Sequence, residues 1–249
     1  MKVLALDTSG QHASAAIVFS DECHGHSVAG EFCLNARQGD KAYTHSDIMM
    51  PAVDQLFKLT GLKLENITHI AYTCGPGSFT GLRIGASCAL GMSFALKIPA
   101  IPVPTLDALA IGAADMGFDG HIRPMQDARR GQVYTALFDS CLVRISDYQA
   151  VSVESLDHDQ KTLFIGDGAL ANRHLLKDVP GAHFADNRNC FIRASSVGIW
   201  AILNPEGRDV GMIYVREPQA VREMGAQTDG DSHSDSRTCA CVTAAGPGD

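Results

Sequence analysis

The sequence predicts a two-lobed α/β fold, with a mixed five-stranded sheet in the first lobe and a reduced second lobe. Residues 1–117 carry three strands in succession and then alternating helices and strands, an order typical of a mixed sheet covered by helices. A weak internal repeat indicates a second lobe of the same design, because residues 4–7 and 124–127 each lead a short strand into an aspartate. An apolar strand then follows in both places, at residues 15–19 and 133–138.

Five strands and three helices are predicted in the first lobe. The strands are apolar runs bounded by turn residues, at residues 3–6, 14–19, 27–34, 67–74 and 100–103. The first helix begins after Thr44, a good N-cap, and ends at Gly61, with apolar residues at helical spacing between them. The second helix runs from a glycine-rich turn to about residue 96. Thr105 caps the third helix, which reaches about residue 116.

The second lobe is expected at residues 118–224. Its predicted strands are residues 122–126, 132–138, 142–153 and 162–165, and a late helix covers residues 191–203. In residues 225–249, Gly, Asp, Ser and Thr replace the large apolar residues. A segment of that composition cannot bury enough apolar surface to fold, so residues 225–249 are predicted to form a disordered tail.

The charge balance argues against direct binding of nucleic acid. Lys and Arg total 20 and Asp and Glu total 28, which gives a formal net charge of −8. Binding to a phosphate backbone depends on many Lys and Arg side chains that release counterions. If RNA is involved, we expect another subunit to supply most of the positive surface.

The N-terminal segment and the cysteines indicate a cytoplasmic protein without a structural metal cluster. Residues 3–6 form a short apolar stretch that Asp7 interrupts, well below the roughly 7–15 apolar residues of a signal peptide or the roughly 20 of a membrane span. We therefore expect no membrane association. None of the eight cysteines belongs to a C-x-x-C pair, and several lie in apolar surroundings, where a free cysteine acts as a small hydrophobe.

The most informative segment is the glycine-rich turn, residues 75–83, which reads Gly-Pro-Gly-Ser-Phe-Thr-Gly-Leu-Arg and joins a buried strand to a helix. Such a junction can hold an anion through backbone N–H groups. A Walker A loop would need Gly-Lys-Ser/Thr at its end, and a dinucleotide fingerprint would need G-x-G-x-x-G, so both fail. The predicted structural turn comprises Gly75, Pro76, Gly77, Ser78, Phe79 and Thr80.

Small residues after this turn suggest close packing. They recur every four positions, at Gly81, Gly85, Ala89 and Ser93. Such a stripe carries almost no side chain, so another element can approach it closely. We favour packing over a bound phosphate for this segment, and both interpretations stay open.

Several segments together resemble the TsaB (YeaZ) family, a bacterial branch of the actin-like ASKHA superfamily. They are residues 6–9 (Leu-Asp-Thr-Ser), His45 and Ser46 with Pro51, residues 75–85, residues 127–134 (Asp-Ala-Arg-Arg-Gly-Gln-Val-Tyr) and residues 214–218 (Tyr-Val-Arg-Glu-Pro). The likeness runs over about residues 1–222. Its most specific parts are the glycine-rich turn and the Asp-Ala-Arg-Arg turn. The tail, with its Cys239-x-Cys241, matches nothing in the family.

The resemblance implies a two-lobed ASKHA fold, which is ribonuclease H-like. It also implies a role in making N6-threonylcarbamoyladenosine at position 37 of tRNAs that read codons starting with A. In that family TsaB pairs with its catalytic paralogue TsaD, and the ATPase TsaE joins them. The chain would then belong to the tRNA N6-adenosine threonylcarbamoyltransferase complex, would form a homodimer in isolation, and would meet tRNA only through the complex.

The residues argue against a catalytic centre in this chain. TsaD-like proteins hold a metal partly by a His-x-x-x-His pair, and the matching positions here are Thr105 and Leu109, neither of which can replace an imidazole. His45 has Met49 four residues on and is predicted to be a helix-start histidine. The serines at the turns lack a Gly-x-Ser-x-Gly elbow. We therefore predict no catalytic residue, no metal ligand and no activity of the chain's own.

Asp7, Asp127 and Gly166 are the candidate positions for adenine-nucleotide binding. The two aspartates stand where related kinases and ATPases place phosphate or metal carboxylates, and Gly166 opens a Gly-Asp-Gly-Ala turn. Alternatively, both aspartates cap their own turns by side-chain hydrogen bonds, and the Gly166 turn only joins a strand to a helix. Arg129 and Arg130 also have two interpretations: contact with an anion or RNA phosphate, or simple solvation.

Two helix faces are predicted to meet a partner. The predicted interface residues are Ile48, Met49, Ala52, Val53, Leu56, Gly81, Gly85 and Ala89. Part of each face must also pack on its own sheet, and the sequence leaves the division open. Because paralogues present similar surfaces, the same faces can form a homodimer or a heterodimer with TsaD. Gly85→Leu, which overpacks the stripe, is expected to abolish pairing with TsaD.

The predicted function is that of a non-catalytic scaffold or activator subunit that dimerises with TsaD and supports threonylcarbamoyl transfer. The alternative is an enzyme, either a small ASKHA-type nucleotide phosphotransferase or ATPase, or a peptidase acting on TsaD. The missing metal ligands, the absent nucleophile elbow and the short second lobe favour the first. ATP turnover that Asp7→Ala or Asp127→Ala removes would favour the second.

Overall fold

The computed structural model describes residues 1–21, 25–35, 37–38, 41–157, 160–206 and 211–215. They belong to one compact unit, Met1–Arg216. The predicted tail, its Cys239-x-Cys241 and the last part of the 214–218 segment lie outside the described residues.

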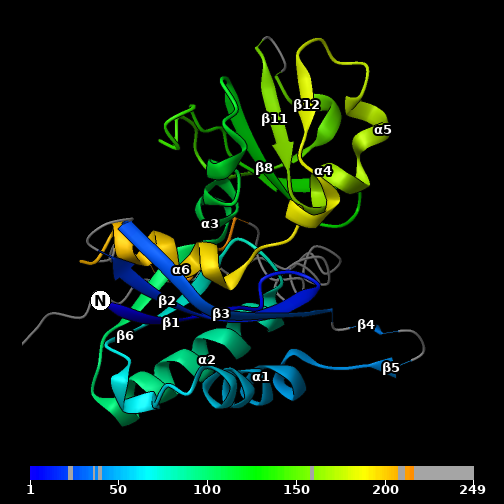
Figure 1. Cartoon of the computed structure of the whole chain (residues 1–249). Helices are drawn as coiled ribbons and strands as arrows, with labels where there is room; N and C mark the ends of the chain where they lie inside the picture. Colours follow the sequence, from blue (N-terminus) through cyan, green and yellow to red (C-terminus); the bar gives the residue numbers. More distant parts are fainter. Residues whose placement is uncertain (22–24, 36, 39–40, 158–159, 207–210, 216–249) are drawn as a thin grey trace, which may run out of the picture. The chain divides into compact units, whose positions relative to one another are not determined.

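The first sheet is mixed and five-stranded, as predicted (Figure 1). Its strand order is β3-β2-β1-β6-β7, with β1 (Lys2–Asp7), β2 (His12–Asp21), β3 (Gly25–Asn35), β6 (His69–Gly75) and β7 (Ala100–Pro104). The first three strands pair antiparallel, whereas β6 lies parallel to β1 and β7 parallel to β6. A short hairpin, β4 (Arg37–Gln38) and β5 (Lys41–Ala42), follows β3.

The second sheet repeats this arrangement. Its strand order is β10-β9-β8-β11-β12, with β8 (His121–Asp127), β9 (Gln132–Thr135), β10 (Gln149–Ser152), β11 (Thr162–Ile165) and β12 (Ala182–Phe184). Again the first three strands pair antiparallel and the next two parallel. The shared order and directions confirm the common design that the weak sequence repeat predicts, and they agree with the two-lobed ASKHA-like fold that the family resemblance implies.

Both faces of the first sheet are covered by helices (Figure 1). α1 (His45–Thr60) and α2 (Phe79–Leu96) pack on one face, and α3 (Thr105–Ile111) and α6 (Ala194–Leu203) on the other. The alternation of β1 supplies both contacts, because successive side chains of a strand point to opposite faces. Leu4 and Leu6 join the core of α1 and α2, while Val3 and Ala5 join the core of α3 and α6.

The bounds of α1 follow from local chemistry that the sequence predicts. Thr44 and Asp47 form a capping box, in which the Asp47 carboxylate accepts from the Thr44 N–H at 2.9 Å. At the other end Gly61 is left-handed, with φ +68°, and its N–H donates to the Phe57 carbonyl at 3.1 Å. The predicted limits of this helix are confirmed.

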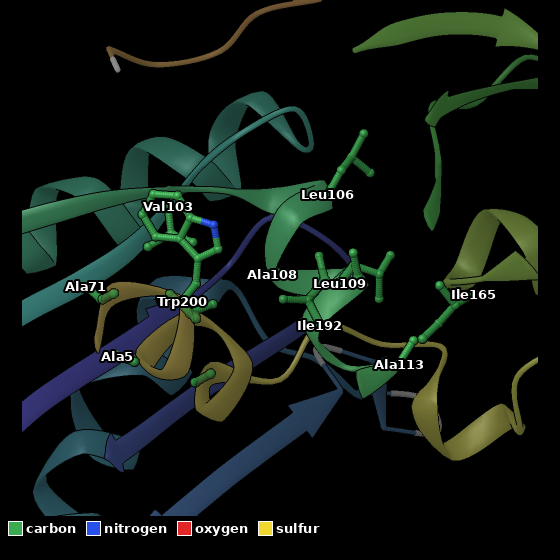
Figure 2. Packing of buried hydrophobic residues seen from close by; sticks show 14 of the residues in the cluster. Ala5, Ala71, Val103, Leu106, Ala108, Leu109, Ala113, Ile165, Ile192 and Trp200 are labelled. Carbon is green, nitrogen blue, oxygen red and sulfur yellow. The ribbon is translucent and has the colours of Figure 1, made fainter. Parts of the chain in front are cut away.

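α6 returns to the first sheet, although the sequence places it within the predicted lobe 118–224. It contacts β1, β2 and α3. A Cβ built on Gly198 would lie 2.6 Å from the Val18 side chain, so the helix backbone sits close on β2. Figure 2 shows Trp200 beside Val103, with Ala5 and Ala71 nearby. The boundary near residue 117 stays a prediction.

The remaining helical segments are short. They are α4 (Asp167–Ala171), α5 (Arg173–Leu176) and the 3-10 turns Leu64–Asn66, Ala114–Met116, Val153–Ser155 and Asn187–Asn189. α3 ends at Ile111 rather than near residue 116, and Pro104 is its N-cap, so the predicted cap at Thr105 was wrong. The predicted strand over residues 142–153 contains only β10, because the Asp139 carboxylate accepts from the N–H groups of Cys141 (2.9 Å) and Val143 (2.8 Å) and holds a turn there.

Glu31 on β3 anchors α6 to the first sheet. Its nearly buried carboxylate accepts from the Ser195 N–H at 2.8 Å, at the first turn of α6, and from the Arg193 guanidinium at 2.9 Å. We expect Glu31→Ala to lower the free energy of unfolding by about 2–3 kcal/mol, because two donors lose a charged acceptor. Chemical denaturation measures this.

Asp54→Ala is the matched control. It removes the exposed Lys58–Asp54 pair on α1, which should change stability by less than about 0.5 kcal/mol. Equal losses in the two variants would contradict the anchoring function of Glu31.

Candidate functional site

The ends of β1, β8 and β11 meet at a small cleft. It is lined by Asp7, Gly10, Gln11, His12, Leu109, Gln126, Asp167, Cys190, Phe191 and Ile192. Two polar atoms of this lining, Gln126 Oε1 and His12 Nδ1, are buried and lack a hydrogen-bond partner in the described part of the chain. Burial lowers the pKa of His12. The acceptor-rich lining makes this the candidate site for a small polar ligand.

Asp7 is buried at the bottom of the β1 turn. Its Oδ1 accepts from the Ser9 N–H (3.0 Å), the Ser9 hydroxyl (2.6 Å) and the Thr73 hydroxyl (2.8 Å). Burial raises the pKa of Asp7, while these hydrogen bonds and the charge of His45 act in the opposite direction. Nucleotide binding and turn capping were the two interpretations of Asp7. The structure shows the hydrogen bonds of turn capping.

Asp127 ends β8 and Gly166 directly follows β11. Asp167, the residue after Gly166, links these two strand ends. The Asp127 N–H donates to Asp167 Oδ1 at 2.9 Å, while the exposed Asp127 carboxylate accepts from the Arg129 N–H at 2.8 Å. Gly166 has φ +113°, and a Cβ there would overlap the Met125 carbonyl, so glycine is required.

Asp167 is the cleft residue that sequence reasoning missed. It is largely buried, and burial, reinforced by the charges of Asp127 and Asp7, raises its pKa to about 6. The signal was present, since Asp167 follows Gly166 in the Gly-Asp-Gly-Ala turn. Above about pH 6 the ionised Asp167 carboxylate disfavours a phosphate in the cleft.

Gln126 joins the second sheet to the first. Its Nε2 donates to the Ser9 carbonyl at 2.9 Å. The same carbonyl accepts from the Ser78 N–H at 2.7 Å, in the glycine-rich turn. One backbone oxygen therefore connects the ends of β1 and β8 to the start of α2.

The glycine-rich turn is packed directly against the β1 turn. A Cβ on Gly81 would overlap the Thr8 carbonyl oxygen, and one on Gly77 would lie 2.6 Å from the Ser9 carbonyl oxygen. The Thr8 hydroxyl donates to the Gly81 carbonyl at 2.7 Å. The Ser78 side chain caps α2 by accepting from the Gly81 N–H at 3.3 Å. These contacts favour the packing interpretation of the turn.

Other residues of the turn form an exposed cluster. The Arg83 guanidinium lies 3.7 Å from the centre of the Phe79 ring, and the rings of Phe79 and Tyr214 are 5.5 Å apart. The Ile213 N–H donates to the Cys74 carbonyl at 2.7 Å. Residues 211–215 therefore lie across the start of α2.

The positions equivalent to a His-x-x-x-His pair have packing functions here. The Thr105 hydroxyl accepts from the Gly75 N–H at 3.2 Å, and Leu109 lines the cleft. Among the described residues, no group of three or more His, Cys, Asp or Glu side chains could hold a metal ion.

All eight predicted interface residues are buried in the protein's own core. They face the first sheet, so their side chains are not available to a partner. A Cβ on Gly85 would overlap the Thr8 hydroxyl, so Gly85→Leu disturbs the fold itself. That variant therefore cannot locate an interface, and the prediction of pairing through α1 and α2 needs other residues of these helices.

The opposite sides of α1 and α2 expose large apolar side chains. We call them the apolar helix surface: Met50 (46% exposed), Leu59 (69%), Leu90 (51%) and Phe94 (87%). Among the described helices, α2 is also the one long and apolar enough to cross a membrane, a property that a core helix can share.

The Asp-Ala-Arg-Arg turn has an unusual backbone. Arg129 (φ +61°), Arg130 (φ +56°) and Gly131 (φ +70°) are all left-handed. The turn is closed by hydrogen bonds from the Ala128 N–H to the Gln132 carbonyl (3.0 Å) and from the Gln132 N–H to the Arg129 carbonyl (3.2 Å). A left-handed backbone costs about 1–2 kcal/mol at each arginine and almost nothing at glycine.

Comparison with known proteins identifies relatives. A family model described as TsaD, tRNA N6-adenosine threonylcarbamoyltransferase, matches residues 40–199. The Bacillus subtilis tRNA threonylcarbamoyladenosine biosynthesis protein TsaB is 33% identical over 189 residues, 73% of this chain and 77% of that protein. The Haemophilus influenzae TsaB is 33% identical over 54% of this chain, and the match spans about half of that relative (52%).

A solved structure agrees with the fold. YeaZ from Pseudomonas aeruginosa has a TM-score of 0.69 and 23% sequence identity, and the match covers 86% of this chain and 99% of that one. A second P. aeruginosa structure, described as an uncharacterized protein with similarity to peptidase YeaZ, matches with the same TM-score and 22% identity.

The glycine contacts predict opposite effects at two positions of α2. Gly81→Ala should destabilise the protein by about 3 kcal/mol, because the new methyl group meets the Thr8 backbone. Gly91→Ala should stabilise it by about 1 kcal/mol, because Gly91 is exposed with nothing near its Cβ position, and alanine favours a helix. Thermal and urea unfolding measure both, and similar effects of the two substitutions would refute the packing interpretation.

The raised pKa of Asp167 predicts a stability that falls with pH. Folding favours the protonated carboxyl, so its contribution is complete below about pH 4 and is lost as pH rises through about 6. In urea unfolding, this carboxyl should cost the wild type about 2–3 kcal/mol of unfolding free energy between pH 4 and pH 7. Asp167→Asn should not show that loss. The exposed Asp178→Asn is the control, and an unchanged pH profile in Asp167→Asn would contradict the assignment.

Proposed function

Because the chain belongs to the TsaB (YeaZ) family, whose bacterial members are named for the biosynthesis of tRNA threonylcarbamoyladenosine, we propose that it takes part in that biosynthesis. It acts as a non-catalytic scaffold or activator subunit. It dimerises with a TsaD-type protein in the cytoplasm and supports threonylcarbamoyl transfer to adenosine 37 of ANN-decoding tRNAs. TsaE is the further partner, and the chain forms a homodimer when TsaD is absent.

The apolar helix surface carries this proposal. Phe94 is 87% exposed and Leu90 is 51% exposed, four residues before it on the same side of α2. Large exposed apolar side chains gathered on neighbouring helices are typical of protein–protein interaction sites. α1 and α2 contact each other and lie on the same face of the first sheet (Figure 1). A partner helix pair can therefore pack on both at once.

A TsaD-type partner suits this surface. The match to the TsaD family model covers residues 40–199 and so includes both helices. Related chains place equivalent helices at equivalent positions, and such surfaces can pair as homodimers or heterodimers. In a heterodimer, the partner would cover the Phe94 side chain, which is exposed to water in the isolated chain.

The cleft supports a non-catalytic function. The Asp7 carboxylate is engaged by three hydrogen bonds from Ser9 and Thr73. Above about pH 6 the Asp167 carboxylate is ionised and repels the phosphates of a nucleotide unless a cation neutralises it.

The enzyme alternative rests on the same carboxylates, because Asp7 and Asp167 line the cleft and the Asp127 N–H donates to the Asp167 carboxylate. In an ATP turnover assay with the purified chain, we expect no turnover that depends on these residues. A robust rate that Asp7→Ala removes would favour a phosphotransferase or ATPase and contradict the scaffold proposal.

Substitution at the apolar helix surface tests the proposal. We expect Phe94→Asp to weaken binding to the TsaD-type partner at least about 30-fold in calorimetry, because a charge must be buried where a phenyl ring packs. In cells depleted of the native protein, the same variant should fail to restore threonylcarbamoyladenosine, measured in bulk tRNA by mass spectrometry.

Val143→Asp is the matched control. Val143 is 57% exposed outside the two helices, so this variant should bind the partner and restore the modification. Unchanged partner affinity in a folded Phe94→Asp variant would show that the interface lies elsewhere on the chain. Normal tRNA modification in depleted cells would refute the proposed function itself.

A further inference from the structure

Two arginine side chains stand free at the end of β8. Arg129 and Arg130 are both exposed. In the part of the chain that the structure describes, no ion pair involves either guanidinium. The one hydrogen bond from Arg129 to a side chain uses its backbone N–H, which donates to the Asp127 carboxylate at 2.8 Å. Within the described residues, the turn therefore leaves the charge of both side chains without a partner.

The backbone of this turn does not call for arginine. Three consecutive left-handed residues are best formed by Gly or Asn, yet Gly131 is the only one here. Strained conformations of this kind persist where the side chain serves a function and the surrounding structure holds the backbone. The buried Ala128 and the hydrogen bonds of Gln132 hold this turn. The strain therefore falls at two positions whose side chains are exposed to solvent, which makes them candidates for contact with a ligand.

We infer that Arg129 and Arg130 contact the phosphate backbone of the RNA substrate, an inference that rests on the proposed function. A guanidinium binds phosphate through two parallel hydrogen bonds and stays charged at any physiological pH. Exposed arginines are typical of backbone contacts, which position a nucleic acid without reading its sequence. This chain then touches tRNA directly, in addition to its contact with the partner.

The surroundings favour RNA over other anions. A free nucleotide needs a pocket, and neither arginine lines the cleft. An acidic protein segment needs apolar anchors, but none of the described residues 121–138 is an exposed large hydrophobic residue. With a net charge of −8, the chain cannot hold RNA alone. The two arginines therefore act as a local contact for an RNA strand that the assembled complex retains.

The test replaces both arginines by a residue that tolerates the turn. In the full chain assembled with its TsaD-type partner, we expect Arg129→Asn with Arg130→Asn to keep or raise the melting temperature, because Asn adopts the left-handed conformation readily. Binding of unmodified tRNA, followed by fluorescence anisotropy at several salt concentrations, should weaken about tenfold. The slope of log K against log salt should fall by about 1.4–1.8, the share of two phosphate contacts.

Arg188→Asn is the control for the loss of an exposed arginine away from this turn, and it is compared with Arg129→Asn and Arg130→Asn made singly, each of which also removes one charge. Arg188→Asn should leave the slope unchanged. Unchanged tRNA affinity and slope in the double variant would overturn the inference. A loss of partner affinity without RNA, measured by calorimetry, would also overturn it and assign the arginines to a protein contact.

The inference and the proposed function fail differently. A wild-type complex that binds tRNA but makes no threonylcarbamoyladenosine would refute the proposed function. The difference in salt slope between the wild type and the double variant reports only on the two arginines.

Discussion

The contact between the β1 turn and the start of α2 is the constraint on which the rest of the structure depends. The Thr8 hydroxyl donates to the Gly81 carbonyl, and the Ser9 carbonyl accepts from the Ser78 N–H. Only glycine at position 81 leaves room for the Thr8 backbone. The Ser9 carbonyl also accepts from the Gln126 side chain, so Ser9 connects the second sheet to the first. The helix, the turn and the cleft therefore form one packed unit.

This contact also favours packing over a bound phosphate as the interpretation of the glycine-rich turn. A glycine-rich junction between a strand and a helix offers backbone N–H groups to an anion. In this protein the Ser78 N–H already binds a carbonyl of the same chain, and the carboxylates of Asp7 and Asp167 lie in the adjoining cleft. The polar groups of this turn therefore serve internal packing.

The groups that remain available face outward. Phe94 and its neighbours form an apolar surface on α1 and α2. The Asp-Ala-Arg-Arg turn exposes Arg129 and Arg130 at the end of β8, where neither forms an ion pair with another described residue. These features differ in chemistry, so they suit different partners: a protein helix pair for the first, and a phosphate backbone for the second. Both sit on elements held by buried contacts, and a fixed surface lowers the entropy lost on binding.

Much of this architecture could be predicted from local patterns. Thr44 and Gly61 mark the ends of α1 by capping chemistry that involves only near neighbours. The glycine-rich turn, the repeat of strand and aspartate, and the family likeness likewise follow from short stretches of sequence. The prediction for residues 142–153 was less accurate, because the carboxylate of Asp139 breaks the strand through hydrogen bonds that apolar patterning does not reveal.

By itself, then, the sequence determined the five strands of the first sheet, the helices between them, the ends of α1 and the family resemblance. The tertiary structure decided which side of each helix is buried: Gly85 and Ala89 face the sheet, while Leu90 and Phe94 face water. It also brought Asp167 beside Asp7, returned α6 to the first sheet and showed the left-handed arginines. The physical reason is that α2 is apolar or small almost all round. Periodicity then cannot assign its faces, and only the position of the β1 backbone selects the one that packs inward.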